Sequence, residues 1–462
     1  CIRDRAIGGG YGLAITSLDG GRVIAHVVLD DGPAAQAGML WGAEILTWNG
    51  RPIAEAVSQT STVWAETPQS TGEGRWLEQL RYLVRDPVGT EVAITFRNPG
   101  EDAPRTANLV AGDDQLEALK RTLPPERDPL DAILRPPVQA EILPSGYGYV
   151  SITGFMPTLG GLHPARIMDR AIESFVAQDV PGVIIDVRGN GGGLDALVPQ
   201  LAGHFYDEPG FYESIAYYDA ASGQFQINPN ETLTIEPRQP FYSGPVMVLV
   251  DKKTASTAEG PPLAIQRLPQ GQVVGAHGSN GSFAMGSPGQ HLYRLPEGIA
   301  FNFLAGRSLD ADQAIQVDGN AEGVGGVAPD VRVPVTEETV YAMFVEERDV
   351  VLETAIAALN DMEYSRYHCR TRFESSPAKW YAGPLQRARS RSQRKGGTMS
   401  EKTILGRTDT PLTVTSLAEQ LRACGLAEGQ TVLVHMAMSK LGWVVGGAEA
   451  VILALLAAVG DS

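Results

Sequence analysis

The sequence predicts an α/β protein made of several parts, and three observations lead to this prediction. In the middle of the chain, an apolar strand over residues 183–187 precedes a glycine-rich turn and a helix, and a second over residues 246–250 precedes a turn that contains a serine. Such alternation of strands and helices is typical of layered α/β folds. Shorter alternating strands fill residues 7–112, and residues 399–462 read as helix, strand and helix. A chain of 462 residues has room for two to four domains.

Composition and charge exclude several classes of protein. Hydrophobic residues make up 43% of the chain, which is enough for packed cores. The net charge of -17 gives no general electrostatic reason to bind nucleic acid or an anionic membrane. No run approaches the length of a transmembrane helix, so we expect none. Cys1, Cys369 and Cys424 are too widely spaced to suggest a disulfide framework or a zinc site, and no metal or cofactor is expected.

Residues 7–112 are predicted to form one small domain. Gly12, Leu13, Ala14 and Ile15 follow three glycines, and further on come the runs Gly-Pro-Ala-Ala-Gln-Ala-Gly-Met and Gly-Ala-Glu-Ile-Leu-Thr-Trp-Asn-Gly. Together these segments resemble a PDZ domain. The resemblance implies a barrel-like α+β fold in which Gly12, Leu13, Ala14 and Ile15 bind the unstructured C-terminus of a polypeptide as an added strand. The alternative is that Gly12 only forms a turn.

A helix and a strand complete this predicted domain. Leu77, Leu80 and Val84 recur at helical spacing, and an alternating strand follows at residues 92–96. A polar insert at residues 58–74 precedes the helix and leaves its start less defined.

Residues 113–140 are charged and proline-rich and are predicted to be a linker, and residues 141–360 form the second large unit. Residues 185–193 read Ile-Asp-Val-Arg-Gly-Asn-Gly-Gly-Gly, residues 248–259 contain Val-Leu-Val-Asp and then Thr-Ala-Ser-Thr-Ala-Glu, and residues 325–331 read Gly-Gly-Val-Ala-Pro-Asp-Val. In this order the motifs resemble those of the C-terminal-processing (tail-specific) serine peptidases. The resemblance implies a crotonase/ClpP-like α/β core, proteolysis, and a periplasmic or secreted location in a bacterium.

The same resemblance makes Ser256 the nucleophile. A serine where a buried strand meets a helix exposes its hydroxyl, and the anionic intermediate that it forms needs fixed N–H donors. The expected oxyanion hole consists of the Thr257 N–H and one N–H of the glycine turn, which we take to be that of Gly192. Glycine suits this turn because it lets the main chain approach a substrate closely. The alternative is structural, since Ser256 and Glu259 also fit a helix capping box.

The general base departs from the family pattern. Relatives carry a lysine in the loop where Gly281 stands here, and some use a histidine where Ser151 stands. His277 lies in that loop, and an imidazole titrates in a range suited to base catalysis, so His277 is the predicted base. His204 and His291 are the alternatives.

Two further features flank the predicted nucleophile. Lys252 and Lys253 precede it at the end of the strand and are expected to face solvent. Pro261 and Pro262 follow it. Proline removes an N–H and clashes with the preceding turn, so the helix behind Ser256 should start late or be broken.

The end of the chain changes character. Residues 364–398 are rich in Arg, Lys, Ser and Gly without apolar periodicity, which predicts a disordered junction, and a basic nucleic-acid-binding arm is the alternative. Residues 399–462 contain the runs Thr-Val-Leu-Val-His and Leu-Gly-Trp-Val-Val-Gly-Gly. These resemble the beginning of aminoglycoside 3-N-acetyltransferases, and the resemblance places His435 near coenzyme A. The run ends early, so we interpret it as a truncated α/β fragment without catalysis.

Three functions therefore stay open. The first is a serine endopeptidase that binds polypeptide C-termini through its PDZ domain and hydrolyses peptide bonds with Ser256. The second is a catalytically impaired protein that only binds peptides. The third is aminoglycoside N3-acetylation by the last segment, which is too short to bury much surface. The substrate preference and the oligomeric state are not readable, and the start at Cys1 predicts that the natural N-terminus is missing or processed.

Overall fold

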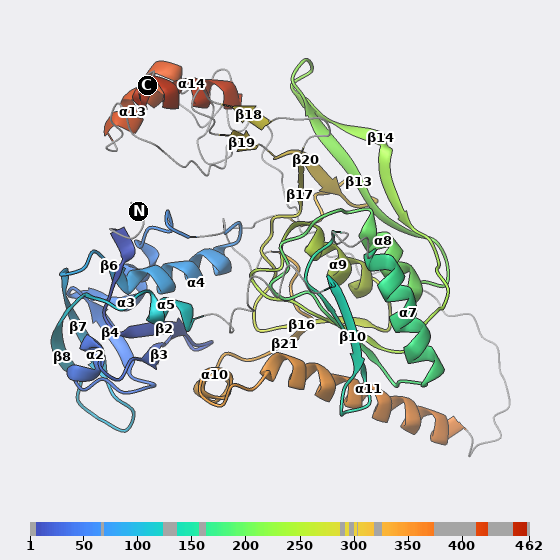
Figure 1. Cartoon of the computed structure of the whole chain (residues 1–462), viewed down its shortest axis with the longest axis horizontal. Helices are drawn as coiled ribbons and strands as arrows, with labels where there is room; N and C mark the ends of the chain where they lie inside the picture. The colour runs from blue at the N-terminus through green and yellow to red at the C-terminus, as the bar shows by residue number, and fades with distance from the viewer. Residues whose placement is uncertain are drawn as a thin grey trace, which may run out of the picture. The chain divides into compact units, whose positions relative to one another are not determined.

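A computed structural model shows the arrangement of most of the chain (Figure 1). It describes residues 6–65, 69–122, 136–156, 163–286, 292–294, 300–302, 304–317, 326–373, 413–423 and 447–459. The chain divides into two compact units, Cys1–Ser376 and Pro377–Ser462, and each is described by itself. The larger unit contains both the PDZ-like part and the predicted peptidase core.

The PDZ-like part is built on a small antiparallel sheet. Its strands follow the order β2-β3-β4-β7-β8, and β5 pairs with β4. The predicted alternation in the fourth of these strands is confirmed, because Val92, Ile94 and Phe96 are buried in the core while their neighbours are not. The strands are β2 (Leu13–Ser17), β3 (Val23–Val28), β4 (Glu44–Trp48), β5 (Arg51–Pro52), β7 (Glu91–Arg97) and β8 (Arg105–Val110).

Helix α4 (Gly72–Leu83) lies against β2 at the edge of this sheet. The Thr71 hydroxyl caps the helix by accepting from the Gly74 N–H at 2.9 Å, which satisfies one of the free donors of the first turn. Leu80 is buried, as the helical spacing predicts. The remaining elements are α2 (Pro33–Gln36), α3 (Ile53–Ser58) and a small sheet of β6 (Arg85–Asp86), β1 (Gly9–Gly10) and β9 (Gly112–Asp113).

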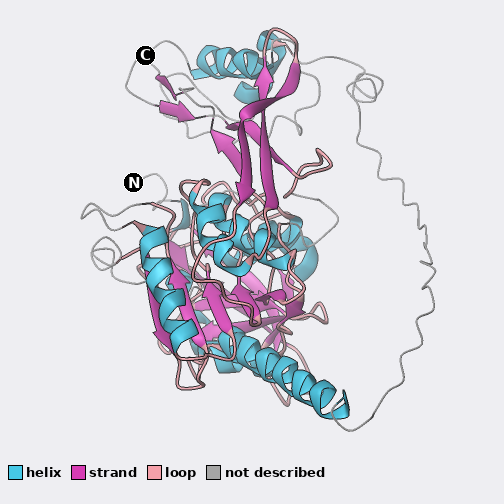
Figure 2. Ribbon diagram, turned by 90° about the vertical axis from the view of Figure 1, so that its right-hand side faces the viewer, coloured by secondary structure: helices cyan, strands magenta, loops and turns pink. Residues whose placement is uncertain are grey.

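The predicted peptidase core is a six-stranded sheet with helices on both faces (Figure 2). The strand order is β10-β11-β12-β15-β16-β21, and each pair is parallel except β10 with β11. Ile185 packs toward α7, α8 and α9, whereas its neighbour Ile184 packs toward α11. Strands covered on both faces need apolar side chains at every position, which explains the apolar runs in the sequence. The elements are β10 (Val138–Ile142), β11 (Gly148–Ile152), β12 (Val183–Asp186), β15 (Val246–Leu249), β16 (Gly271–Gly275), β21 (Val331–Arg332), α7 (Pro164–Ala177), α8 (Leu197–Ala202), η1 (Gly203–Phe205), α9 (Gly260–Gln266) and α11 (Val350–Phe373).

A long two-stranded ribbon extends from the core (Figures 1 and 2). It consists of β13 (Gly210–Asp219) and β14 (Gln224–Ile235), and β13 also pairs with β20 (Leu304–Leu309). The register shifts between Phe211 and Glu213, so Tyr212 is an extra, bulged residue. As a result Tyr212 and Glu213, which would face opposite sides of a regular strand, are both fully buried. Shorter pairings join β17 (Ala284–Gly286) to β20, and β18 (Leu292–Arg294) to β19 (Ala300–Asn302).

Two predicted boundaries differ from the structure. The predicted linker at residues 113–140 contains the short helix α5 (Glu117–Lys120), and residues 123–135 lie outside the described ranges. Helix α11 continues to Phe373, so the start of the predicted junction at residues 364–398 is helical, and the rest lies outside the described ranges. The N-terminal part of α11 packs on the sheet and holds the helix in place. Because helix propagation is cooperative, α11 continues into the polar segment that its composition predicted to be disordered.

The structure describes two helices in the smaller unit. They are α13 (Val414–Ala423) and α14 (Gly447–Val459), and they pack through a small apolar cluster that includes Leu417, Val451 and Ala454. Both agree with helices expected from the sequence. The predicted strand at residues 431–435, with His435, lies outside the described residues.

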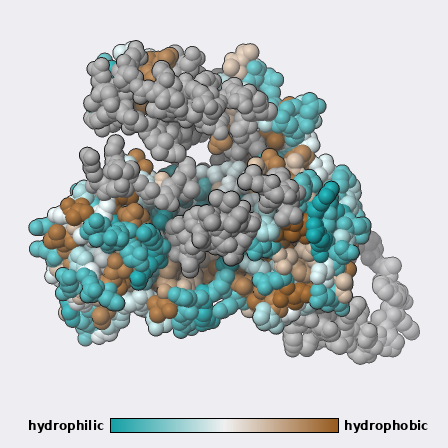
Figure 3. Space-filling model, in the orientation of Figure 1, coloured by the Kyte–Doolittle hydropathy of each residue, from teal (hydrophilic) through white to brown (hydrophobic). Residues whose placement is uncertain are grey.

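The surface drawn in Figure 3 mixes hydrophilic and hydrophobic residues over the described elements. The exposed large hydrophobic side chains of the described residues are distributed over several segments of the chain, for example Leu40, Val63, Val176 and Tyr218. Within the described ranges, every helix is too short or too polar to cross a bilayer.

Candidate active site

The two turns that carry the main motifs meet at one edge of the parallel sheet. Strands β12 and β15 are neighbours and run in parallel, so the turns that follow them emerge side by side. The Ala255 N–H donates to the Asn190 carbonyl at 3.0 Å, and the Thr257 hydroxyl donates to the Gly193 carbonyl at 3.0 Å. The serine turn and the glycine turn are therefore joined by direct hydrogen bonds.

Gly192 lies directly against Ser256. A Cβ atom on Gly192 would be 2.8 Å from the Ser256 Cβ and 3.0 Å from the Thr257 nitrogen. The φ angle of Gly192 is +106°, which residues with a side chain rarely adopt. Both the space and the backbone conformation therefore require glycine at this position.

Ser256 itself has a strained backbone. Its φ of +54° lies in the left-handed region, and such a conformation costs roughly 1–3 kcal/mol outside glycine. The residue begins the 3-10 helix η2 (Ser256–Glu259), and the α-helix α9 starts only at Gly260 with proline in its first turn. The late helix start that the proline pair predicts is thus confirmed. Ser256 is only partly buried, and its hydroxyl makes no hydrogen bond to a described residue.

Glu259 connects the serine turn to the loop at residues 277–282, which contains the predicted base His277. Its buried carboxylate accepts from Ser279 Oγ at 2.5 Å, from the Gly281 N–H at 2.7 Å and from the Ser282 N–H at 2.9 Å. It also accepts from the Ser256 N–H, which is one half of the capping box, while the Ser256 hydroxyl does not supply the other half. Burial raises the pKa of Glu259 to about 7, although these donors oppose the rise.

The structure corrects one predicted oxyanion donor. The Gly192 N–H already donates to Asn190 Oδ1 at 2.9 Å, so it is not free to bind a substrate oxygen. Within the described ranges the Gly193 N–H has no acceptor. It points away from Phe155, because the carbonyl of the same planar peptide group accepts from the Phe155 N–H at 3.1 Å. Three successive glycines are equivalent in sequence, so only the fold could distinguish these two donors.

His277 is held by a carboxylate from the PDZ-like part. Its Nδ1 lies 3.0 Å from Glu73 Oε1 in the first turn of α4, and the Gly278 N–H donates to Glu73 Oε2 at 3.1 Å. Since Nδ1 faces a carboxylate, it carries the ring proton, and Nε2 is left as the acceptor. The described contacts include no hydrogen bond between His277 and Ser256.

The other candidate bases are engaged elsewhere. Lys252 does not face solvent as expected; its Nζ donates to Glu78 Oε1 at 2.9 Å, because α4 lies over the end of the strand. Burial lowers the pKa of the Lys252 ammonium, and the Glu78 carboxylate opposes that effect. His204 is fully buried, with one ring nitrogen 3.0 Å from Asp169 Oδ1 and the other against a main-chain carbonyl. His291 lies outside the described residues.

The predicted peptide-binding run lies at the edge of the PDZ-like sheet. Gly12 immediately precedes this edge strand with φ at +74°, and Leu13, Ala14 and Ile15 belong to it. In the described sheet β2 pairs with β3 along one side, and its other side is not paired with a strand. Helix α4 packs against β2. An edge strand next to a helix is the arrangement that strand addition by a peptide uses.

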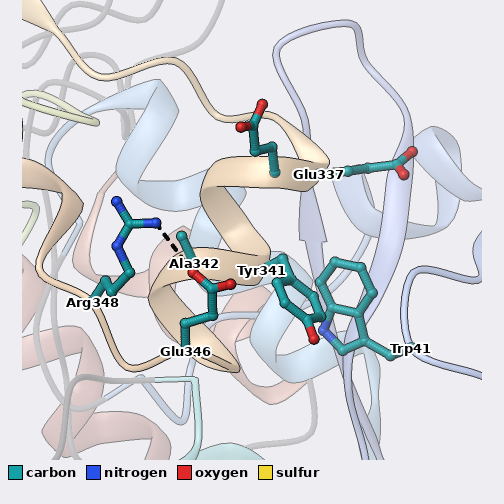
Figure 4. Close-up of a pocket in the computed structure, with 7 residues that line it drawn as sticks. Trp41, Glu337, Tyr341, Ala342, Glu346 and Arg348 are labelled. Carbon is teal, nitrogen blue, oxygen red and sulfur yellow. Dashed lines mark hydrogen bonds and ion pairs between the residues drawn. The ribbon is translucent and has the colours of Figure 1, made fainter.

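A cavity of about 310 Å³ lies elsewhere, at the side of α10 (Glu337–Phe344) (Figure 4). Trp41 and Tyr341 line it edge to face with ring centroids 4.9 Å apart, and Glu346 pairs with Arg348 at 3.1 Å. None of the candidate catalytic residues lines this cavity, so the cavity is separate from the candidate site at the two turns. In the described part of the chain, no three His, Cys, Asp or Glu side chains gather as metal ligands would.

Comparison with known families identifies the region that holds the two turns. The model of "Peptidase family S41" matches residues 146–333. This region is an S41 peptidase domain. The chain is also 22% identical over 262 residues to the carboxy-terminal processing protease CtpB of Bacillus subtilis, covering 57% of this chain and 44% of CtpB. The S41 domain is thus similar to the C-terminal processing proteases, as the motifs predict.

Two further similarities complete the comparison. A short segment is 49% identical over 63 residues to aminoglycoside N(3)-acetyltransferase VII of Streptomyces paromomycinus, or 14% of this chain and 22% of that protein. The predicted acetyltransferase resemblance is therefore confirmed. The crystal structure of mature CPAF matches with a TM-score of 0.49 and 15% identity, covering 77% of this chain and 84% of CPAF. The chain spans less than two thirds of the length of CtpB and of the acetyltransferase.

Proposed function

We propose that the S41 domain is a serine endopeptidase in which Ser256 is the nucleophile. The observation that carries the proposal is the packing of Ser256 against the glycine turn, since a Cβ on Gly192 would lie only 2.8 Å from the Ser256 Cβ. A strained serine at the carboxyl edge of a parallel sheet, with a free hydroxyl, is the arrangement expected of an activated nucleophile. The Thr257 and Gly193 N–H groups are the proposed donors to the oxyanion.

The proposed reaction is acyl transfer through an ester of Ser256. The Ser256 Oγ attacks the carbonyl carbon of the scissile bond while its proton moves to Nε2 of His277. The resulting imidazolium gives this proton to the departing amine, and water later hydrolyses the ester by the same proton route. Glu73 holds the proton on Nδ1 and stabilises the imidazolium. Since no described contact joins His277 to Ser256, substrate binding has to complete this hydrogen bond.

We further propose that the PDZ-like part captures the unstructured C-terminus of a polypeptide beside β2. Main-chain N–H groups near Gly12 would receive the terminal carboxylate, and Leu13, Ala14 and Ile15 would pair with the added strand. Similarity to the carboxy-terminal processing protease CtpB supports this substrate class. A periplasmic or secreted location is part of the same proposal and follows from the family resemblance alone.

A fluorophosphonate probe should label the full-length chain, and Ser256→Ala should abolish both the labelling and the hydrolysis of an unfolded polypeptide. The probe reports an activated serine, because it reacts by the same attack as a substrate. Ser222→Ala, in an exposed turn of the ribbon, is the matched control and should label normally. Absence of labelling and of turnover in the unmodified chain would leave only the peptide-binding function, and turnover that survives in Ser256→Ala would point to another nucleophile.

His277→Ala should lower kcat by about 100-fold or more, because a serine without its base is a poor nucleophile. Glu73→Gln should retain part of the activity and shift the acidic limb of the pH–kcat profile, since an amide does not stabilise the imidazolium. His163→Ala, at the start of α7, serves as the control histidine. Unchanged kcat in His277→Ala would remove this residue from the mechanism without affecting the role of Ser256.

A further inference from the structure

Three polar side chains with buried oxygen atoms lie together next to the serine turn, and the proposed mechanism uses none of them. Asp195 follows the glycine turn, and Tyr212 and Glu213 come from the bulge in β13. We call these three residues the acidic cluster. Within the described ranges, Asp195 Oδ1, Tyr212 Oη and Glu213 Oε1 are each buried without a hydrogen-bond partner. Buried polar atoms are almost always paired, so three orphans at one place indicate a missing partner.

Contacts on two sides connect the acidic cluster to the proposed nucleophile. The Thr257 hydroxyl, in the residue after Ser256, lies close enough to the Asp195 carboxyl to act on it, although it donates its proton to the Gly193 carbonyl. A Cβ on Gly260, at the start of α9, would be only 2.1 Å from the Tyr212 hydroxyl oxygen. The cluster is therefore in contact with both ends of the short helix that begins with Ser256.

The charges around the acidic cluster favour a cation as the missing partner. Among the described residues, no salt bridge joins Asp195 or Glu213 to a basic side chain. The Arg267 guanidinium acts electrostatically on Tyr212 and Glu213, but it donates its hydrogen bonds to the main-chain carbonyls of Phe211 and Tyr212 and to Gln316. Glu231 on β14 adds negative charge, and Tyr217 donates to it at 2.6 Å.

The acidic cluster has too few hydrogen-bond donors from the protein to satisfy its two carboxyl groups. Ser308 supplies one hydrogen bond, to Glu213 Oε2 at 2.6 Å, and leaves the other oxygen without a partner. Burial first and the charge of Asp195 second raise the pKa of Glu213 to about 8, and burial raises the pKa of Asp195 to about 6. Two carboxyl groups held in this way gain most from a ligand that brings a positive charge and several N–H donors.

We propose that Asp195, Tyr212 and Glu213 form a subsite that receives a basic side chain, lysine or arginine, of the polypeptide substrate next to Ser256. Asp195 is only partly buried and follows the exposed residues Gly193 and Leu194, so it is the member that an entering side chain meets first. Guanidinium and ammonium groups would satisfy the three orphan oxygens together. The inference rests on the proposed peptidase function for its substrate, but the site can be tested by binding alone.

Agmatine, a small guanidinium compound, is the binding probe for calorimetry on the full-length chain. We expect binding that strengthens as the pH rises from about 6 to 8, because the guanidinium displaces protons from the two carboxyls. Asp195→Asn should weaken it by about tenfold or more, and the double variant with Glu213→Gln should weaken it further. Glu208→Gln, an exposed carboxylate before the ribbon, is the matched control and should bind like the unmodified chain.

Internally quenched peptides test the consequence for hydrolysis. Peptides with lysine or arginine before the scissile bond should have at least about tenfold higher kcat/KM than leucine peptides, and Asp195→Asn should remove the preference. Hydrolysis without this preference, together with agmatine binding that is absent or equal in Asp195→Asn, would overturn the subsite and leave the peptidase intact. Agmatine binding without any hydrolysis would instead remove the peptidase function and retain a cation site.

Discussion

Gly192→Ala should lower peptidase turnover by about 100-fold or more, the size of effect seen when an oxyanion donor is displaced. The added methyl group would meet the Ser256 Cβ at 2.8 Å, the Thr257 nitrogen at 3.0 Å and the Ala255 carbonyl oxygen at 3.1 Å. Two of these atoms belong to the main chain and the third is a Cβ atom, so a change of side-chain rotamer cannot relieve the clash. The φ of +106° adds strain of its own, so the two turns have to separate.

Gly191→Ala is the matched control for this experiment. A Cβ at Gly191 would meet nothing within 4 Å, and the residue is exposed on the same turn. Turnover and thermal stability should therefore stay close to those of the unmodified chain. If Gly192→Ala and Gly191→Ala are equally active, the serine does not work against the glycine turn and the proposed site is wrong.

The larger unit should lose stability as the pH rises from about 6.5 to 8; at lower pH the buried His26 and His204, whose pKa burial lowers, oppose this trend because their contribution to stability grows as the pH rises. Burial raises the pKa of three carboxyl groups in the fold, to about 8 for Glu213, about 7 for Glu259 and about 6 for Asp195, from ordinary values near 4. A raised pKa means that the folded state binds more protons than the unfolded state, so stability is greatest below the unfolded pKa and falls through the folded pKa. Together the three carboxyl groups should lower the free energy of unfolding by at most several kcal/mol over this pH range.

Urea unfolding at pH 5, 6, 7 and 8 measures this dependence, with the free energy of unfolding extrapolated to water. Glu213→Gln should flatten the curve most and should stabilise the fold at pH 8, because an amide is not charged in the buried site. Glu208→Gln is the control, since that side chain is exposed. A slope in Glu213→Gln equal to that of the unmodified chain would falsify the assignment of the pH dependence to Glu213.

The motifs allowed much of the core to be predicted. Strands over residues 183–187 and 246–250 were expected from continuous apolar runs, and parallel strands buried on both faces have that pattern. The late start of α9 was expected from Pro261 and Pro262, because proline acts on its own local backbone. The closeness of Ser256 to the glycine turn was implied by the order of the family motifs along the chain, because the hydrophobic periodicity says nothing about it.

Other features depended on contacts between distant segments. The assignment of an oxyanion donor changed from Gly192 to Gly193, because Asn190 uses the first N–H. Lys252 was expected in solvent but pairs with Glu78, and the link between His277 and Glu73 had no signal in either segment. Helix α4 supplies both carboxylates, and its position over the core cannot be derived from local sequence.

The sequence by itself predicted the family of the S41 domain and the order of its main strands and helices, and it named Ser256 as the proposed nucleophile. The tertiary structure decided which hydrogen-bond donors near it are free, which carboxylate holds the histidine, and which buried acids surround the turn. The physical reason is range: propensity and hydrophobic period act over a few residues, whereas hydrogen-bond partners and burial come from segments that only folding brings together.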